Sequence, residues 1–357
     1  MEPFIYVRGL RHAEHSVCAV QDGQKYYRDT QFGRDMAYSS GQQVKRSIID
    51  ALTSTMNVPF AAITFNWEID KKNNKANQKE PHSPCDPTYP DQLLGGYMKA
   101  ESDNFTVKRR SPLSISAMRP LHPLLGGIET PKENLTFDRT SHPNHHKVNV
   151  FWLDGNKRGN KLTEEELEDW LNERKRNLPN RAFIQDQTRA SGLFVYDVAI
   201  DLRTLFCVST NRLEPELFLE TEQKLRDNGW IEGKNVFGSC LICPKEQRDK
   251  IIPALAHALL NWRITSNQAR TFSLMETLAA AISTNANQIA YAIRGELRED
   301  TDRPTATPKI DETTKASIFV TPSCSGYVRG SVGSADALDN AEAQLVAMMS
   351  AFDYENQ

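Results

Sequence analysis

The sequence predicts an α+β fold in which a small antiparallel sheet is backed by helices and carries one large insertion. Strand-like and helix-like segments are mixed, without the regular β-α-β alternation of a parallel sheet. Residues 189–209 (RASGLFVYDVAIDLRTLFCVS) have the clearest strand pattern, and we expect a central pair of strands there. Between residues 70 and 146, long polar stretches cannot form a core, which indicates an insertion much longer than an ordinary loop.

The first elements are predicted within residues 1–69. β-branched and aromatic residues over 4–20 predict a strand. Apolar residues at helical spacing predict an amphipathic helix over 42–56. They are Val44, Ile48, Ile49 and Leu52. Alternating apolar and polar residues over 61–69 predict a second strand.

The segment after the insertion is predicted to form a strand over 146–156 and then a helix over 163–177. The helix has an acidic first turn and a basic last turn, which match the helix dipole. Thr163 and Glu166 have the spacing of a capping box, in which each residue satisfies a free backbone N–H of the other.

The rest of the chain is predicted to contain three helices and a late strand. Helices are expected over 214–230 and 244–264, and the last helix over 331–352. Residues 314–323 are expected to form the strand. In 269–293 the apolar residues are too dense to distinguish helix from strand, so both remain open.

Composition and charge limit the possible functions. The chain has 357 residues, of which 39% are hydrophobic and 25% charged, and this is typical of a folded globular protein. Its net charge of −3 means that nucleic-acid binding would need a local basic surface. No apolar run is long enough for a signal peptide or a membrane span, and six scattered cysteines indicate reduced thiols. We therefore expect a cytoplasmic protein.

Candidate metal ligands and enzyme motifs are sparse. Cys240 and Cys243 form a CxxC, which supplies only two of the four ligands of a zinc site. Buried strand cysteines are the favoured interpretation, with metal or redox use as the alternative. His142, His145 and His146 lie in a polar stretch and are interpreted as exposed. No dinucleotide, phosphate-loop, zinc-protease or hydrolase motif is present, so the sequence indicates no cofactor, metal or catalytic centre.

Residues 95–120 combine cations with apolar side chains. The cations are Lys99, Lys108, Arg109, Arg110 and Arg119. Cations bind phosphates, and apolar or aromatic tips stack on bases or wedge between them. Alternation in 111–118 (SPLSISAM) predicts a hairpin strand that presents such a tip. By composition alone, a solvated basic loop is the favoured interpretation, and RNA contact is the alternative.

Two weaker signals lie outside that segment. Lys45 and Arg46 stand near the start of the first helix, where cations oppose the helix dipole and a bound phosphate would offset the cost. On the residues alone, a solvated first turn is the favoured interpretation. Arg329 lies in the glycine-rich turn 325–334, whose backbone amides are able to approach a phosphate.

Four motifs occur in an order that resembles one known family. They are QQVKRS (42–47), LLGGYMKA (93–100), KRRSPLSISAMRP (108–120) and ENLTFDR (133–139). In this order they resemble the DevR-type backbone subunits of Cascade complexes in type I CRISPR systems. These subunits belong to the repeat-associated RNA-binding superfamily. The resemblance covers roughly Phe4 to Arg139 by motifs and the remainder only by the order of elements.

The resemblance implies a fold and a function. It implies a modified RNA-recognition-motif (ferredoxin-like) palm, helical fingers and a β-hairpin thumb. Residues 1–69 and 147–357 would form the palm with its helical insertions, and 70–146 would contain the thumb. Several copies would bind along a CRISPR guide RNA, with other Cascade subunits, and leave its bases free to pair with target DNA. The family implies no catalytic role for this subunit.

The same resemblance implies roles for individual residues. Guide phosphates would be contacted by Lys45, Arg46, Lys108, Arg109, Arg110 and Arg119, and Arg329 is a further candidate from its turn. Ile115 and Met118 would wedge at a base step. The chain departs from the family in the unusually polar segment 70–90 and in a second half that carries no recognisable motif.

Two other functions stay open. In type III complexes, related backbone subunits cut target RNA with a loop aspartate ahead of the lysine-bearing helix, and Asp29 or Asp35 lies in the comparable place here. The alternative is therefore a metal-dependent ribonuclease. A transcriptional regulator is the third possibility, since the family has been described as autoregulatory.

Overall fold

The computed structural model divides the chain into two units. It describes residues 2–18, 24–65, 67–70, 75–78, 81–100, 106–138, 150–154, 157–175, 181–264, 274–299 and 303–357. The main body comprises Met1–Glu129 and Arg189–Gln357, and the second unit is Thr130–Thr188. This division differs from the predicted insertion 70–146, because the part of it before residue 130 belongs to the main body.

The main body is built on an antiparallel sheet. Its central strand β1 (Phe4–Ser16) pairs on one side with β13 (Arg181–Asp201) and on the other with β17 (Thr277–Ser283). The order continues outward to β10 (Gly126–Asp138) beside β13 and to β20 (Ser317–Val320) beside β17. Helices and an antiparallel sheet in one body confirm the α+β class.

Two short strands from the basic segment also belong to this sheet. β8 (Leu113–Ile115) and β9 (Arg119–Pro120) both pair antiparallel with β13. Residues 111–118 therefore do not form the free hairpin that their alternation predicted. The hairpin of this segment lies earlier, between β6 (Tyr97–Ala100) and β7 (Thr106–Arg109).

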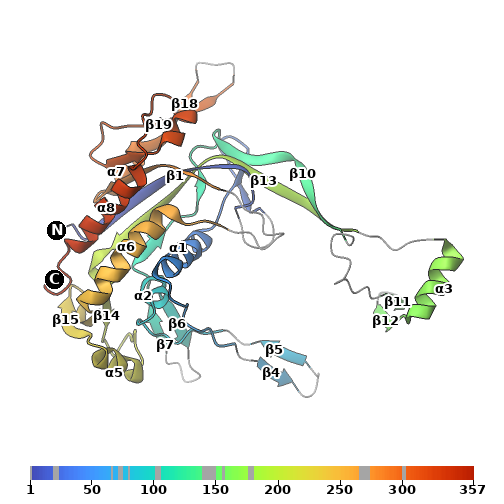
Figure 1. Ribbon diagram of the computed structural model, residues 1–357, viewed down its shortest axis with the longest axis horizontal. Coiled ribbons are helices and arrows are strands. Elements are labelled where there is room, and N and C mark those ends of the chain that lie inside the picture. The colour runs from blue at the N-terminus through green and yellow to red at the C-terminus, as the bar shows by residue number, and fades with distance from the viewer. Residues whose placement is uncertain are drawn as a thin grey trace. The chain divides into compact units, whose positions relative to one another are not determined.

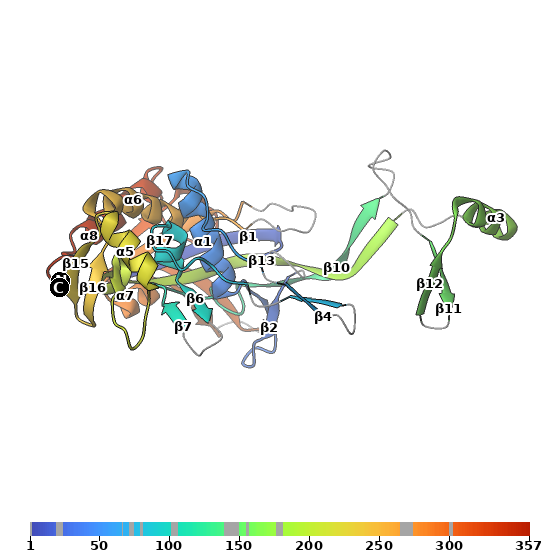
Figure 2. The ribbon, with the colours of Figure 1, turned by 90° about the horizontal axis from the view of Figure 1, so that it is seen from below.

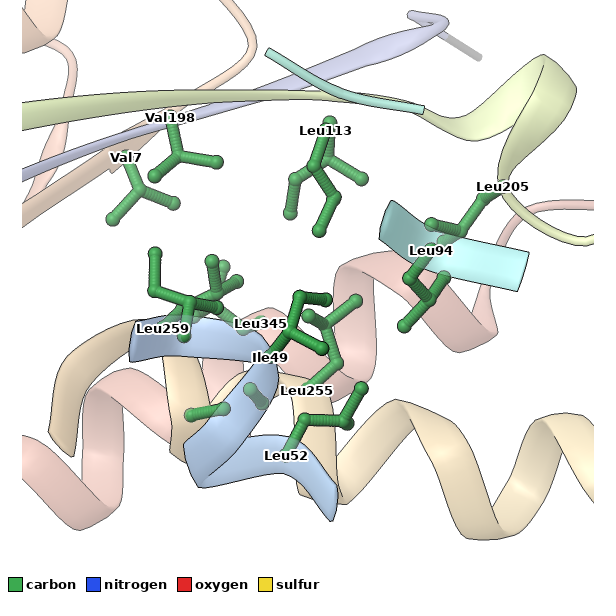
Figure 3. Close-up of a cluster of buried hydrophobic side chains, with 14 of the residues drawn as sticks. Val7, Ile49, Leu52, Leu94, Leu113, Val198, Leu205, Leu255, Leu259 and Leu345 are labelled. Atoms are coloured by element: carbon green, nitrogen blue, oxygen red, sulfur yellow. The ribbon is translucent and has the colours of Figure 1, made fainter. Parts of the chain in front are cut away.

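Helices cover one face of the sheet. These are α1 (Gly41–Met56), α6 (Lys245–Asn261) and α8 (Ala337–Ser350), and Figure 2 shows α1 and α6 on the same side of β13. Alternate residues of the strands point to this face, as expected from the period of a strand. Figure 3 shows this core, in which the sheet residues Val7, Val198 and Leu113 face Ile49, Leu52, Leu255, Leu259 and Leu345 of the helices.

The opposite face of the same sheet is also apolar. Leu10 and Val195 point to it and pack in a second cluster with Ile289 of the short helix α7 (Ala286–Ala292). A sheet buried on both faces needs apolar residues at consecutive positions. This explains why residues 193–200 read as a nearly continuous hydrophobic run.

The remaining elements of the main body are short. The helices are α2 (Pro90–Gly95), α4 (Leu202–Leu205), α5 (Leu219–Asp227) and the 3₁₀ turn η2 (Pro322–Gly326). A small sheet has the order β14 (Cys207–Ser209), β16 (Gly238–Ile242), β15 (Ile231–Asn235). Two-stranded pairs are β2 (Tyr26–Arg28) with β3 (Asp35–Ala37), β4 (Trp67–Asp70) with β5 (Lys75–Gln78), and β18 (Ile293–Arg298) with β19 (Thr305–Ile310).

The second unit contains residues 130–138 of β10 and 181–188 of β13, together with the hairpin β11 (Phe151–Asp154) and β12 (Lys157–Lys161), followed by α3 (Glu164–Arg174). The predicted capping box is confirmed. The Thr163 backbone N–H donates to Glu166 at 2.8 Å, and the Glu166 backbone N–H donates to the Thr163 hydroxyl at 3.2 Å. The helix ends at Lys175, whose backbone is left-handed.

Several predicted elements differ in extent. The segment 269–293, for which helix and strand both remained possible, contains one of each, since strand β17 is followed by helix α7. The strand predicted over 61–69 begins only at Trp67. The expected pair of strands over 189–209 is one long strand, β13, followed by the single turn of α4 and by β14 in another sheet. Within the described residues, no helix is long and apolar enough to cross a membrane.

Candidate nucleic-acid interface

A cleft of about 990 Å³ lies in the main body where α1 begins. Four segments line it, and three of them carry family-like motifs. They are the start of α1 from Ser40 to Ile49, residues 60–63, α2 from Asp91 to Gly96, and residues 110–117. Segments far apart in the sequence therefore meet at one site.

Backbone contacts hold the start of α1 against residues 115–118. The Ser39 backbone N–H donates to the Met118 carbonyl at 2.9 Å, and the Met118 N–H donates back at 3.0 Å. A Cβ on Gly41 would lie 2.6 Å from the Ile115 carbonyl oxygen, so only glycine fits there. Ser40 caps the helix, because its hydroxyl accepts from the Gln43 backbone N–H at 3.3 Å.

A second glycine joins α2 to the same cleft. Gly96 has φ +78°, which side chains rarely adopt, and a Cβ there would lie 2.7 Å from the Arg109 carbonyl oxygen. This close approach places Arg110 and Ser111 beside the end of α2. The second glycine of the motif LLGGYMKA thus has a geometric cause.

Lys45 and Arg110 line the cleft as cations without a protein anion among the described residues. Lys45 is half-buried, and burial lowers the pKa of its amine because the charged form loses solvation. Arg110 is exposed. In the part of the chain that the structure describes, these two cations without an anionic partner line a cleft at the start of α1, whose first turn holds no acidic residue, and this makes the site suited to an anion.

Arg46 lies in the same cleft with a different set of contacts. Its Nε is 2.8 Å from Asp50 Oδ1, and its guanidinium carbon lies 4.2 Å from the centroid of the Phe60 ring. The side chain remains 61% exposed, so a phosphate is able to compete with Asp50 for it. Phe60 stands in no motif, and no sequence pattern pointed to it.

Arg109 was predicted to contact a phosphate, and its surroundings contradict this prediction. The residue is only 3% exposed. Its guanidinium donates to the Leu93, Cys207 and Thr204 carbonyls at 3.0, 2.8 and 2.9 Å, and to Glu216 Oε2 at 3.1 Å. These partners occupy its donors, so Arg109 joins α2 to α4 and β14 and is not placed to contact a phosphate.

The two predicted wedge residues are also placed differently. Met118 is fully buried in the main core, which is incompatible with insertion between bases. Ile115 is half-buried: it lines the cleft and packs against the main core, and does not stand on a projecting tip. Lys108 is exposed on β7, outside the residues that line the cleft.

Arg119 and Arg329 lie elsewhere on the main body. Arg119 is 3.5 Å from Asp197 Oδ2, and the same carboxylate pairs with Arg8 at 2.6 Å. Arg329 is exposed beyond η2, close in sequence to Tyr327. The Tyr327 ring stacks on His12 at 4.0 Å, and His12 Nδ1 is 3.6 Å from Glu276 Oε1. Neither arginine shares the cleft with Lys45 and Arg110.

The candidate ribonuclease aspartates are engaged in local contacts. Asp29 Oδ1 accepts from the Phe32 backbone N–H at 2.7 Å within the β2–β3 turn. Asp35 pairs with Arg28 at 3.1 Å. Within the described part of the chain, no group of three His, Cys, Asp or Glu side chains is placed to hold a metal ion.

The cysteines are all buried and none forms a disulfide. Cys240 on β16 and Cys243 just after it are both buried, which confirms the structural interpretation of the CxxC. Burial raises the pKa of the Cys243 thiol to about 12. The histidines His142, His145 and His146 lie outside the described residues.

Comparison with known proteins gives structural matches alone. No family model matches the chain, and no curated protein matches it. One similar solved chain is described as "CRISPR RNA-guided surveillance complex, pre-nicking", with a TM-score of 0.43 and 11% identity over 97% of this chain and 89% of that one. Another, a "CRISPR RNA-guided surveillance complex" chain, has a TM-score of 0.36 and 10% identity over 97% and 84%. These values are too low for the likeness to carry a functional assignment.

Proposed function

We propose that this chain binds CRISPR guide RNA along its phosphate backbone, as a non-catalytic, multi-copy backbone subunit of a Cascade-type surveillance complex. The observation that carries the proposal is the cleft at the start of α1. It gathers three motifs of the family-like series, and its cations Lys45 and Arg110 have no protein anion among the described residues.

The chemistry of the cleft suits a single RNA strand. Lys45 and Arg110 attract a phosphate, and the first turn of α1 adds free backbone N–H groups. Apolar Ile115 and the stacked pair of Arg46 and Phe60 offer surfaces for a base. Because the whole chain has a net charge of −3, binding would depend on these local groups.

The non-catalytic part of the proposal rests on the two aspartates. A metal-dependent ribonuclease needs carboxylates that converge on an ion. Asp29 instead closes a turn, and Asp35 is paired with Arg28. The proposed partners are the guide RNA, target DNA through guide pairing, further copies of the chain and other Cascade subunits.

The binding proposal is tested by salt titration of single-stranded RNA affinity. Lys45→Ala should weaken binding to all RNA sequences by a common factor and reduce the slope of log K against log salt by about 0.7. Lys234→Ala removes an exposed lysine of β15 outside the cleft and serves as the control. The proposal would be contradicted if both variants showed the same affinity and the same salt slope. A loss of affinity that depends on RNA sequence would also contradict it.

The multi-copy part has its own test. When the protein is expressed with the products of its neighbouring genes, RNA of uniform length should copurify with the assembly. An assembly that forms without RNA, or that holds RNA of random lengths, is the contrary result.

A further inference from the structure

Arg46 contacts one neighbour that lines the cleft and one that does not. Its guanidinium carbon lies 4.2 Å from the centroid of the Phe60 ring, and both residues line the cleft. Its Nε lies 2.8 Å from Oδ1 of Asp50, which is four residues further along α1 and outside the residues that line the cleft. One cation of the cleft is therefore paired with an anion of the protein itself.

The ion pair of Arg46 and Asp50 is accessible to solvent and weak. The Arg46 side chain is 61% exposed and the Asp50 side chain 48%. Burial raises the pKa of the Asp50 carboxyl above its ordinary value, and the attraction of Arg46 does not cancel this effect. Exposed pairs at this helical spacing contribute little to stability. An incoming anion is therefore able to take the guanidinium from Asp50.

An RNA phosphate is the anion that the cleft favours as the new partner of Arg46. Phosphate oxygens match two N–H groups of a guanidinium, which gives strong, paired hydrogen bonds. Lys45 and Arg110 line the same cleft and attract the phosphate toward it. Once the phosphate holds Arg46, Asp50 is left as a carboxylate without its cation, one helical turn away. This change costs free energy and lowers the affinity for RNA.

We infer that Asp50 is a built-in competitor of the RNA: it pairs with Arg46 while the cleft is empty and gives Arg46 up when a phosphate binds. The inference rests on the proposed function and concerns how tightly each copy binds. Asp50 holds the affinity of a single copy below the value that its cations alone would give. Several copies on one RNA strand act together, so weak binding by each copy is compatible with a stable assembly.

The test measures binding of single-stranded oligo(C) to the full chain by fluorescence anisotropy over a range of salt concentrations. Asp50→Asn keeps the size of the side chain and removes its charge. It should tighten binding roughly 2- to 5-fold, as expected for the loss of one exposed ion pair. The slope of log K against log salt should become steeper, by up to about 0.7, because Arg46 then adds a complete phosphate contact. In the unaltered protein that contact is offset, since a counterion collects at the released Asp50 carboxylate.

A second aspartate of the chain provides a matched control. Asp249 pairs with Lys245 at 2.6 Å with the same helical spacing on α6, and its side chain is 55% exposed. Both residues lie outside those that line the cleft. Asp249→Asn makes the same change in net charge and should leave the affinity and the salt slope unchanged. An equal gain in both variants would show an effect of net charge alone and would overturn the inference.

A double variant separates the release of Arg46 from simple repulsion between Asp50 and the RNA. Arg46→Ala should weaken binding, and Asp50→Asn added to it should give little gain, because no guanidinium remains to be released. The same gain without Arg46 would mean that Asp50 acts by repulsion, contrary to the inference. If Asp50→Asn binds like the unaltered protein while Lys45→Ala still weakens binding, the inference fails and the proposed function stands. If the unaltered protein does not bind oligo(C), both fail.

Discussion

Arg109 and Arg110 are adjacent in KRRSPL, yet they have opposite surroundings. Strand β7 alternates its faces, so Val107 and Arg109 point inward while Lys108 points outward. A run of three cations hides this alternation, because cations are ordinarily exposed. Sequence alone therefore identified the cationic segment, but it did not predict which arginine is buried.

Replacing Arg109 tests its structural role. Arg109→Met removes hydrogen bonds to three carbonyls and leaves Glu216 without its buried partner. We expect a loss of about 3 kcal/mol in the free energy of unfolding, measured by urea denaturation. Lys108→Met, one residue away and exposed, should change it by less than about 0.5 kcal/mol. Equal stability of the two variants would show that the Arg109 contacts contribute nothing.

At the scale of elements, local signals predicted the helices better than the strand partners. The helices over 42–56 and 163–177 were predicted from periodicity and caps, and both are present. The alternation of 111–118 did predict strand residues. Its partner β13 lies about 80 residues later in the chain, and no local pattern reveals such pairing.

The single turn of α4 shows a different limit of sequence patterns. Residues 189–209 are apolar on both faces, so their pattern contains no break at Asp201. There the Asp201 side chain accepts from the Arg203 backbone N–H at 3.1 Å and starts the turn. In the sequence, an aspartate within an apolar run was the only available signal of this turn. Without the structure, a capping aspartate cannot be distinguished from an ordinary strand residue.

Gly41 allows a test of how the start of α1 packs against residues 115–116. Gly41→Ala would place a methyl group 2.6 Å from the Ile115 carbonyl, so the start of the helix must move away from residues 115–116. We expect a loss of about 1–3 kcal/mol in stability, together with weaker RNA binding. Gly326→Ala is the control, since a Cβ there meets nothing within 4 Å and the residue lies outside the cleft. Equal RNA binding and equal stability of the two variants would contradict the assigned geometry.

At the scale of the whole molecule, the site depends on tertiary structure. The order of the motifs is visible in the sequence, whereas the sheet brings residues 110–117 to the start of α1 through the pairing of β8 with β13. Asp91 and Gln92 precede the motif LLGGYMKA and carried no signal of their own. The predicted cations are divided by the fold into cleft residues, a buried arginine and distant surface arginines.

Hydrogen exchange measured by mass spectrometry tests, over the whole chain, which of the predicted cations lie at the RNA site. Single-stranded oligo(C) should slow exchange in residues 41–47 and 111–117, because the ligand covers backbone amides that the start of α1 leaves without intrahelical partners. Residues 322–330 should be unchanged, since Arg329 lies outside the cleft and its neighbour Tyr327 packs beside the His12–Glu276 pair. Lys45→Ala should abolish the protection at both cleft segments together. Protection at 322–330 without protection at 41–47 would move the RNA site to the other surface and leave the cleft without its assigned ligand.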